Sequence, residues 1–150
     1  MEHAALERAA WAWQSALELW RGPAFDGLRS YVLQAEALRL EEMRMAVMEH
    51  RINADLRAGR YERVLPDLMK LNVLHPGRER MVGQLMIALH ATDRHAEALG
   101  AYRTLQRYLS DQYGTKPGPR LRRMQELLLR VPVEASELLA TLVDGRLPVG

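Results

Sequence analysis

The chain has 150 residues, about the length of one domain, and can bury a hydrophobic core without covalent cross-links. It contains no cysteine, which excludes disulfides, thiolate nucleophiles and Cys-ligated metals and favours a reducing, cytoplasmic setting. Its 21 basic and 19 acidic residues leave a net charge of only +2, a weak case for nucleic-acid binding. No apolar stretch approaches the roughly 20 residues of a membrane span, so we expect no membrane association.

Good helix formers separated by Gly and Pro, with almost no strand signals, predict an all-α protein of about seven helices. Pro66 predicts either a helix start near Val64 or a kink, because proline removes a backbone donor. Gly59 is placed to end the long second helix, which carries an apolar row at helical spacing. The predicted helices are 4–20, 30–58, 61–74, 78–91, 96–113, 120–130 and 134–143, and the apolar row is Leu33, Ala37, Leu40, Met48, Ile52 and Leu56.

Two segments match each other without a gap at an offset of 34 residues. They are "GRYERVLPDLMKL" (59–71) and "DRHAEALGAYRTL" (93–105). The offset equals the period of the tetratricopeptide repeat, in which stacked helix pairs bury faces that no pair can bury alone. The alignment therefore predicts that Val64 and Ala98, Leu68 and Tyr102, and Leu71 and Leu105 are equivalent packing positions.

The repeats are degenerate. Arg51 and Asp55 stand where the repeat normally has apolar residues, and Asp93 replaces the glycine of the turn between helices. Ala9, in the first helix, lies 55 residues before Val64, which is not a multiple of 34. We therefore expect a compact, tetratricopeptide-like helical bundle, not a long solenoid.

Three strings in a fixed order resemble the bacterial transcriptional activator domain of the Streptomyces antibiotic regulatory protein family. They are "ALELWRGPAFDGL" (16–28), "HPGRERMVGQLMIALHATDRHAEALGAYRTL" (75–105) and "YGTKPGPRLRRM" (113–124). The resemblance covers about residues 4–131 and implies an all-helical, tetratricopeptide-like domain used in transcription activation. It implies that the domain self-associates, as a homodimer, and contacts the transcription machinery, that is, RNA polymerase subunits or another regulator domain.

Members of that family usually carry a winged-helix DNA-binding domain before this one, whereas here the resemblance begins within the first few residues. We therefore expect no DNA binding from this segment alone. The expected organisation is an activator domain over residues 1–131, followed by a short helix and tail over 132–150.

Tryptophans and methionines are the first candidates for a binding surface. Trp13 and Trp20 share one helix face, which favours core packing, while Trp11 points about 200° away from Trp13 and is either exposed or covered by a partner. Methionines could form an adaptable surface, but filling gaps in the core is the favoured interpretation. The methionines concerned are Met43, Met45, Met48, Met69, Met81 and Met86.

Charged residues give two further candidates. Arg51 and Asp55, at i and i+4, either pair with each other or line an inner groove as a polar recognition point. Arg120, Arg122 and Arg123, with Arg130, form the densest basic cluster. That cluster is either a solvated helix face or a contact for an acidic protein or a DNA backbone.

Catalysis and cofactors are not expected. The five histidines include no H-x-x-x-H pair, and there is no G-x-S-x-G motif, phosphate-binding glycine loop or nucleophile with a matching base. The leading hypothesis is a non-catalytic interaction and self-association domain of a transcriptional activator. The alternatives are a free-standing adaptor or ligand-sensing module, and nucleic-acid binding through the 120–130 cluster.

Overall fold

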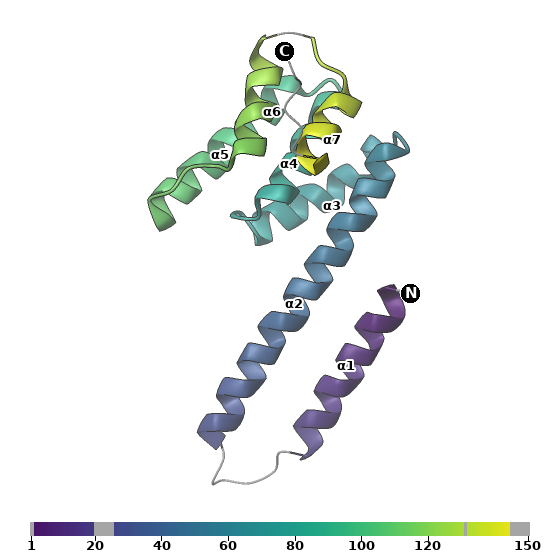
Figure 1. Cartoon of the computed structure of the whole chain (residues 1–150), viewed down its shortest axis with the longest axis vertical. Helices are drawn as coiled ribbons and strands as arrows, with labels where there is room; N and C mark the ends of the chain where they lie inside the picture. Colours follow the sequence, from purple (N-terminus) through teal and green to yellow (C-terminus); the bar gives the residue numbers. More distant parts are fainter. Residues whose placement is uncertain (1, 20–25, 131, 145–150) are drawn as a thin grey trace. The chain divides into compact units, whose positions relative to one another are not determined.

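The computed structural model describes residues 2–19, 26–130 and 132–144, and over these ranges the chain forms seven α-helices and no strand, which confirms the all-α prediction (Figure 1). The chain divides within α2 into two units, Met1–His50 and Arg51–Gly150. The helices are α1 (Glu2–Leu19), α2 (Asp26–Arg57), α3 (Tyr61–Leu74), α4 (Glu79–Ala91), α5 (His95–Tyr113), α6 (Pro119–Arg130) and α7 (Ala135–Asp144).

The helix boundaries follow the sequence signals closely. The largest difference is at α2, which begins at Asp26, four residues before the predicted start. α3 has the predicted range 61–74, and of the two alternatives for Pro66 the late start near Val64 is wrong, because α3 begins at Tyr61 and continues through Pro66. Pro66 leaves only the carbonyl of Glu62 without its helical donor, and because both residues are exposed, water can satisfy that carbonyl.

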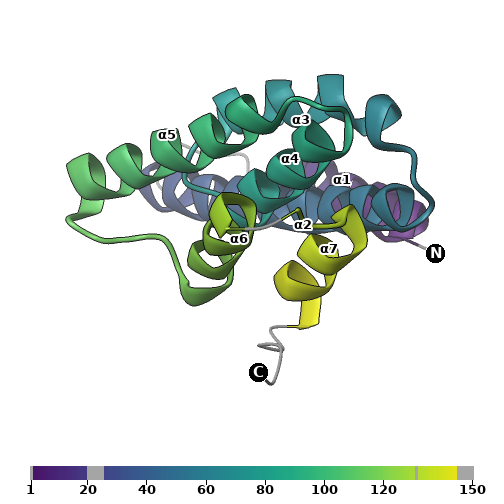
Figure 2. The same cartoon turned by 90° about the horizontal axis from the view of Figure 1, so that it is seen from above.

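α4 is the centre of the second unit. Every residue from Met81 to Leu89 is buried, because α4 packs against α3, α5, α6 and α7 (Figure 2). An ordinary surface helix keeps a polar stripe towards water, whereas a helix that is apolar nearly all round belongs inside. Gln84, the polar exception, donates from Nε2 to the Asn53 Oδ1 of α2 at 2.8 Å.

The packing of α3 and α5 confirms the 34-residue repeat. The three residue pairs that the alignment makes equivalent are all buried, Val64 with Ala98, Leu68 with Tyr102, and Leu71 with Leu105. The larger Tyr102 occupies the position of Leu68 on the same face of its helix. The two helices therefore make equivalent use of the same positions, as a helical repeat requires.

α7 departs from simple repeat stacking, since it packs against α4 as well as α6. Its leucines, Leu138, Leu139 and Leu142, are buried. Gly83 makes this approach possible, because a Cβ at that position would lie 2.6 Å from Leu142 Cδ1. α7 thus covers the side of α4 that α3 and α5 leave open. The tail expected after it falls at 145–150, outside the described residues.

None of the helices in the described part of the chain is both long enough and apolar enough to cross a bilayer.

Candidate interaction surfaces

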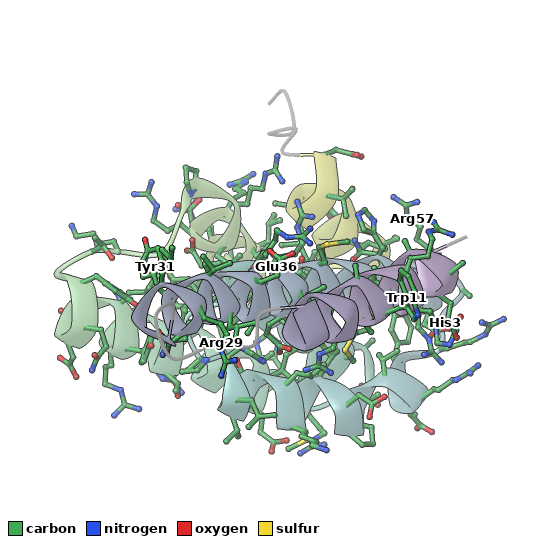
Figure 3. All side chains as sticks on the ribbon, turned by 90° about the horizontal axis from the view of Figure 1, so that it is seen from below. His3, Trp11, Arg29, Tyr31, Glu36 and Arg57 are labelled. Atoms are coloured by element: carbon green, nitrogen blue, oxygen red, sulfur yellow. The ribbon has the colours of Figure 1, made fainter. Side chains whose placement is uncertain are left out.

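Trp11 lies on the exposed side of α1. It is 72% exposed, and Figure 3 shows Trp11 and His3 on this side of α1. Glu7 lies one turn before Trp11 and His3 two turns before it, with His3 Nε2 3.8 Å from Glu7 Oε1. A tryptophan that keeps most of its surface in water is available to a partner. The side chains of Trp13 and Trp20, expected in the core, lie outside the described residues.

Asp55 pairs with Arg60 and not with Arg51. Arg60 Nη1 donates to Asp55 Oδ1 at 3.0 Å, and the Arg60 backbone N–H bonds to the Asp55 carbonyl at 2.9 Å. The turn at Gly59 brings Arg60 back over the end of α2, which spacing along a helix alone does not reveal. The predicted ion pair between Arg51 and Asp55 is therefore wrong. Asp55 is 13% exposed and Arg51 is exposed, and a recognition role for the two residues stays a prediction.

The basic cluster on α6 is divided among different roles. Arg120 Nη1 donates to the carbonyl of Leu142 at 3.2 Å, which ties α6 to the end of α7. Arg123 Nη1 bonds to Glu126 Oε2 at 3.1 Å. Arg122 and Arg130 are exposed. Of the three arginines proposed as a partner site, Arg120 and Arg123 thus already have intramolecular partners, and Arg122 is exposed.

The structure shows an apolar row on α2 that the sequence reasoning missed. Leu28, Tyr31 and Leu38 are 57%, 72% and 73% exposed, and Ala35 between them is also exposed. Their spacing of three, four and three residues places them on one side of the helix. Of the apolar row that was predicted, Leu33 and Leu40 are half-buried, Ala37 between them is exposed, and Ile52 and Leu56 are buried further along. The spacing of the outer row was the signal that could have revealed it.

α3 also presents apolar side chains to solvent. Met69, Val73 and Leu74 are exposed. At the positions of α5 equivalent to Met69 and Val73, the chain has the charged residues Arg103 and Arg107. Of the methionines considered for a binding surface, Met45, Met81 and Met86 are buried, so the core interpretation is confirmed for those three. Met69 is the exposed one, and Met43 and Met48 are half-buried.

Cavities of the second unit are lined by charges of both signs. One of about 410 Å³ opens where α4 and α6 begin, lined by Glu79, Arg80, Arg120 and Asp144 among others. Glu79 already has a partner there, since its Oε1 accepts the Gly118 N–H at 2.5 Å. This hydrogen bond fixes the Pro-Gly-Pro turn before α6, which is a structural role.

Two titratable side chains of the second unit, His90 and Tyr102, also have structural roles. His90 Nε2 lies 2.7 Å from the Val133 carbonyl oxygen and His90 Nδ1 lies 3.2 Å from His95 Nδ1, so His90 connects α4 with α5 and with the segment before α7. Burial raises the pKa of Tyr102, an effect that the Arg122 charge opposes. In the described ranges, no three His, Asp or Glu side chains come together in a way that could hold a metal ion.

Comparison with known proteins agrees with this arrangement. The family described as the bacterial transcriptional activator domain matches residues 1–129. Regulatory protein DnrI of Streptomyces peucetius is 38% identical over 130 residues, which are 86% of this chain and 48% of DnrI. Regulatory protein AfsR of Streptomyces coelicolor is 35% identical over 129 residues, 86% of this chain and 13% of AfsR.

A solved structure extends the likeness to the fold. The structure of Mycobacterium tuberculosis EmbR in complex with a low affinity phosphopeptide matches with a TM-score of 0.69 and 35% sequence identity, covering 96% of this chain and 40% of that chain. The fold and the family therefore define a helical domain of transcriptional regulators. The chain belongs to the bacterial transcriptional activator domain family, which it shares with the Streptomyces antibiotic regulatory proteins. It spans less than half the length of these relatives.

Proposed function

We propose that this domain acts by binding other proteins: it self-associates and contacts the transcription machinery, RNA polymerase subunits or another regulator domain. The proposal rests on the family and on one feature of the surface. Within the described part of the first unit, large apolar side chains are exposed on both helices, Trp11 on α1 and Leu28, Tyr31, Val32 and Leu38 on α2. Clustered exposed apolar residues mark interaction sites on soluble proteins.

The polar groups favour contact with proteins over contact with DNA. A DNA-binding face holds arginines free to neutralise phosphates. On α6, two of the clustered arginines are engaged with Leu142 and Glu126, and Glu126 adds an opposing charge to that surface. We therefore expect no duplex binding by this segment alone, and a gel shift at low salt that showed strong, salt-sensitive binding would contradict this.

The experiment is a binding assay of the purified chain against isolated RNA polymerase subunits, immobilised one at a time, with sedimentation of the free chain run in parallel. We expect saturable binding to at least one subunit and concentration-dependent self-association. Trp11→Ala serves as a first surface variant, because Trp11 is exposed and its loss leaves the core intact. If co-purification brings down only proteins outside transcription, the adaptor alternative replaces this proposal.

A further inference from the structure

The outer row of α2 is formed by Leu28, Tyr31, Ala35 and Leu38. It lies on the side of the helix opposite to the half-buried residues. Each of its four members is exposed, whereas Arg29, Leu33, Glu36 and Leu40, on the other side, are half-buried. Figure 3 shows Tyr31 and Arg29 leaving α2 on different sides. The row is therefore an exposed apolar strip along about three helical turns of the first unit.

We propose that a second copy of this chain covers the outer row, with the two α2 helices packed antiparallel. This inference rests on the self-association proposed above and adds its surface and geometry. Pairing a row with itself through a two-fold axis is the commonest arrangement of homo-oligomers, because one patch then serves both subunits. The spacing of three and four residues is the spacing of helices that pack side by side with interdigitated side chains.

The sizes of the side chains select the antiparallel direction. In a parallel, in-register pair, Tyr31 would face its own copy and Ala35 would face Ala35, which leaves one layer overfilled and the next one empty. In an antiparallel pair centred near Leu33, Leu28 faces Leu38, and Tyr31 lies over Ala35. Each of the four layers then contains either two leucines or one tyrosine and one alanine, and all four fill a similar volume.

The charges around the outer row are compatible with this pairing. Val32 and Gln34 flank the row nearest the two-fold axis, so no like charges meet there. Glu36 and Arg39 are already paired within each copy, with Arg39 Nε 2.9 Å from both Glu36 oxygens, and Arg39 lowers the pKa of the Glu36 carboxyl. Antiparallel helices also align their macrodipoles favourably.

The size of the row sets the expected strength. Four side chains on each copy form an interface smaller than the ~1,200 Å² at which stable, specific interfaces begin, so the pair should be transient. We expect a dissociation constant in the micromolar range, on the order of 10 µM. Tyr31→Glu should weaken self-association at least tenfold and leave the helical circular dichroism unchanged, because Tyr31 is 72% exposed in the single chain.

Because the chain contains no cysteine, introduced cysteines can test whether the two α2 helices pack antiparallel. We would prepare Leu28→Cys and Leu38→Cys variants of the 150-residue chain, one with an affinity tag, and oxidise them separately and mixed. The antiparallel pair predicts disulfides mainly between the two different variants, since like positions lie about 15 Å apart along the helix axis. Val73→Cys, 79% exposed on α3, measures random collision.

Cross-linking of each variant with itself, and not with the other, would overturn the antiparallel geometry. Mixed cross-linking no greater than the Val73→Cys background, together with concentration-dependent sedimentation of the wild type, would overturn this interface and leave the proposed self-association standing. A wild type that stays monomeric at every concentration would overturn both.

Discussion

Gly59 and Asp93, 34 residues apart, occupy the same position in two turns that share three equivalent backbone hydrogen bonds. Both have left-handed backbones, with φ of +74° at Gly59 and +61° at Asp93. The next residue donates to a carbonyl five positions earlier in both turns, Arg60 to Asp55 at 2.9 Å and Arg94 to Leu89 at 2.8 Å. The repeat therefore extends from side-chain packing to backbone conformation, and Asp93 holds a glycine conformation without being glycine.

Asp93→Gly should stabilise the domain by about 0.5–1 kcal/mol, because glycine adopts a positive φ without the steric cost that other residues meet. Gly59→Ala should destabilise it by about 1–2 kcal/mol through backbone strain alone, since no atom lies within 4 Å of the added Cβ. Urea unfolding of the two variants measures both effects. A stabilising Gly59→Ala would show that the turn is not held in this conformation.

Gly83→Ala should destabilise the domain by about 1–3 kcal/mol, because the new Cβ would lie 2.6 Å from Leu142 Cδ1 and push α7 away from α4. Gly100→Ala is the matched control on α5. There, Arg103 Nη2, the end of a flexible side chain, lies 3.8 Å from the added Cβ. The control should gain about 0.5–1 kcal/mol from helix propensity. Equal unfolding midpoints for the two variants would contradict the packing of α7 on α4.

Glu79→Ala should cost about 1–3 kcal/mol, because it leaves the partly buried Gly118 N–H without its charged acceptor. Glu79→Gln keeps an acceptor and should cost less. Glu62→Ala is the comparison, because Glu62 also lies in the first turn of a helix and is exposed, so only about 0.3–1 kcal/mol of helix-dipole interaction is lost. Hydrogen exchange at the Gly118 amide should accelerate in Glu79→Ala but stay unchanged in Glu62→Ala.

Stability should fall at alkaline pH partly through Tyr102. Burial raises the pKa of Tyr102 in the folded state, so above the unfolded value near 10 the unfolded chain loses its proton first. Tyr102 thus leaves stability unchanged below about pH 10 and lowers it as the pH rises from there through its folded pKa. Tyr102→Phe should flatten this fall, measured by urea unfolding between about pH 8 and pH 11. Identical pH profiles for both proteins would contradict burial of the phenol.

The sequence was informative wherever local chemistry decides the structure. Helix formers, Gly and Pro set the seven helices, and the 34-residue offset identified Ala98, Tyr102 and Leu105 as core positions, all of which are buried. The other face of α5, which carries Arg103 and Arg107, is exposed, as expected for a polar face. Pro66 did not delay the start of α3 to Val64, because one missing backbone bond near a solvated helix start costs little.

The surfaces were harder to predict because they depend on which neighbours the fold supplies. Asp55 pairs with Arg60 only because the Gly59 turn reverses the chain, and Arg120 finds the Leu142 carbonyl only because α7 returns to α6. α2 carries two apolar rows, and periodicity alone did not say that Leu28, Tyr31 and Leu38 would stay outside. Trp11 was predicted to be exposed or covered by a partner because it points away from Trp13, and it is exposed.

Self-association is tested most directly by sedimentation velocity of the wild-type chain across a concentration range from about 1 µM to about 1 mM, which brackets the expected affinity. We expect the weight-average mass to rise from that of a monomer towards that of a dimer as concentration increases, and we expect the same rise in Tyr31→Glu only at concentrations at least tenfold higher. A single wild-type species of monomer mass throughout, with no binding to any RNA polymerase subunit, would contradict the function proposed for this domain.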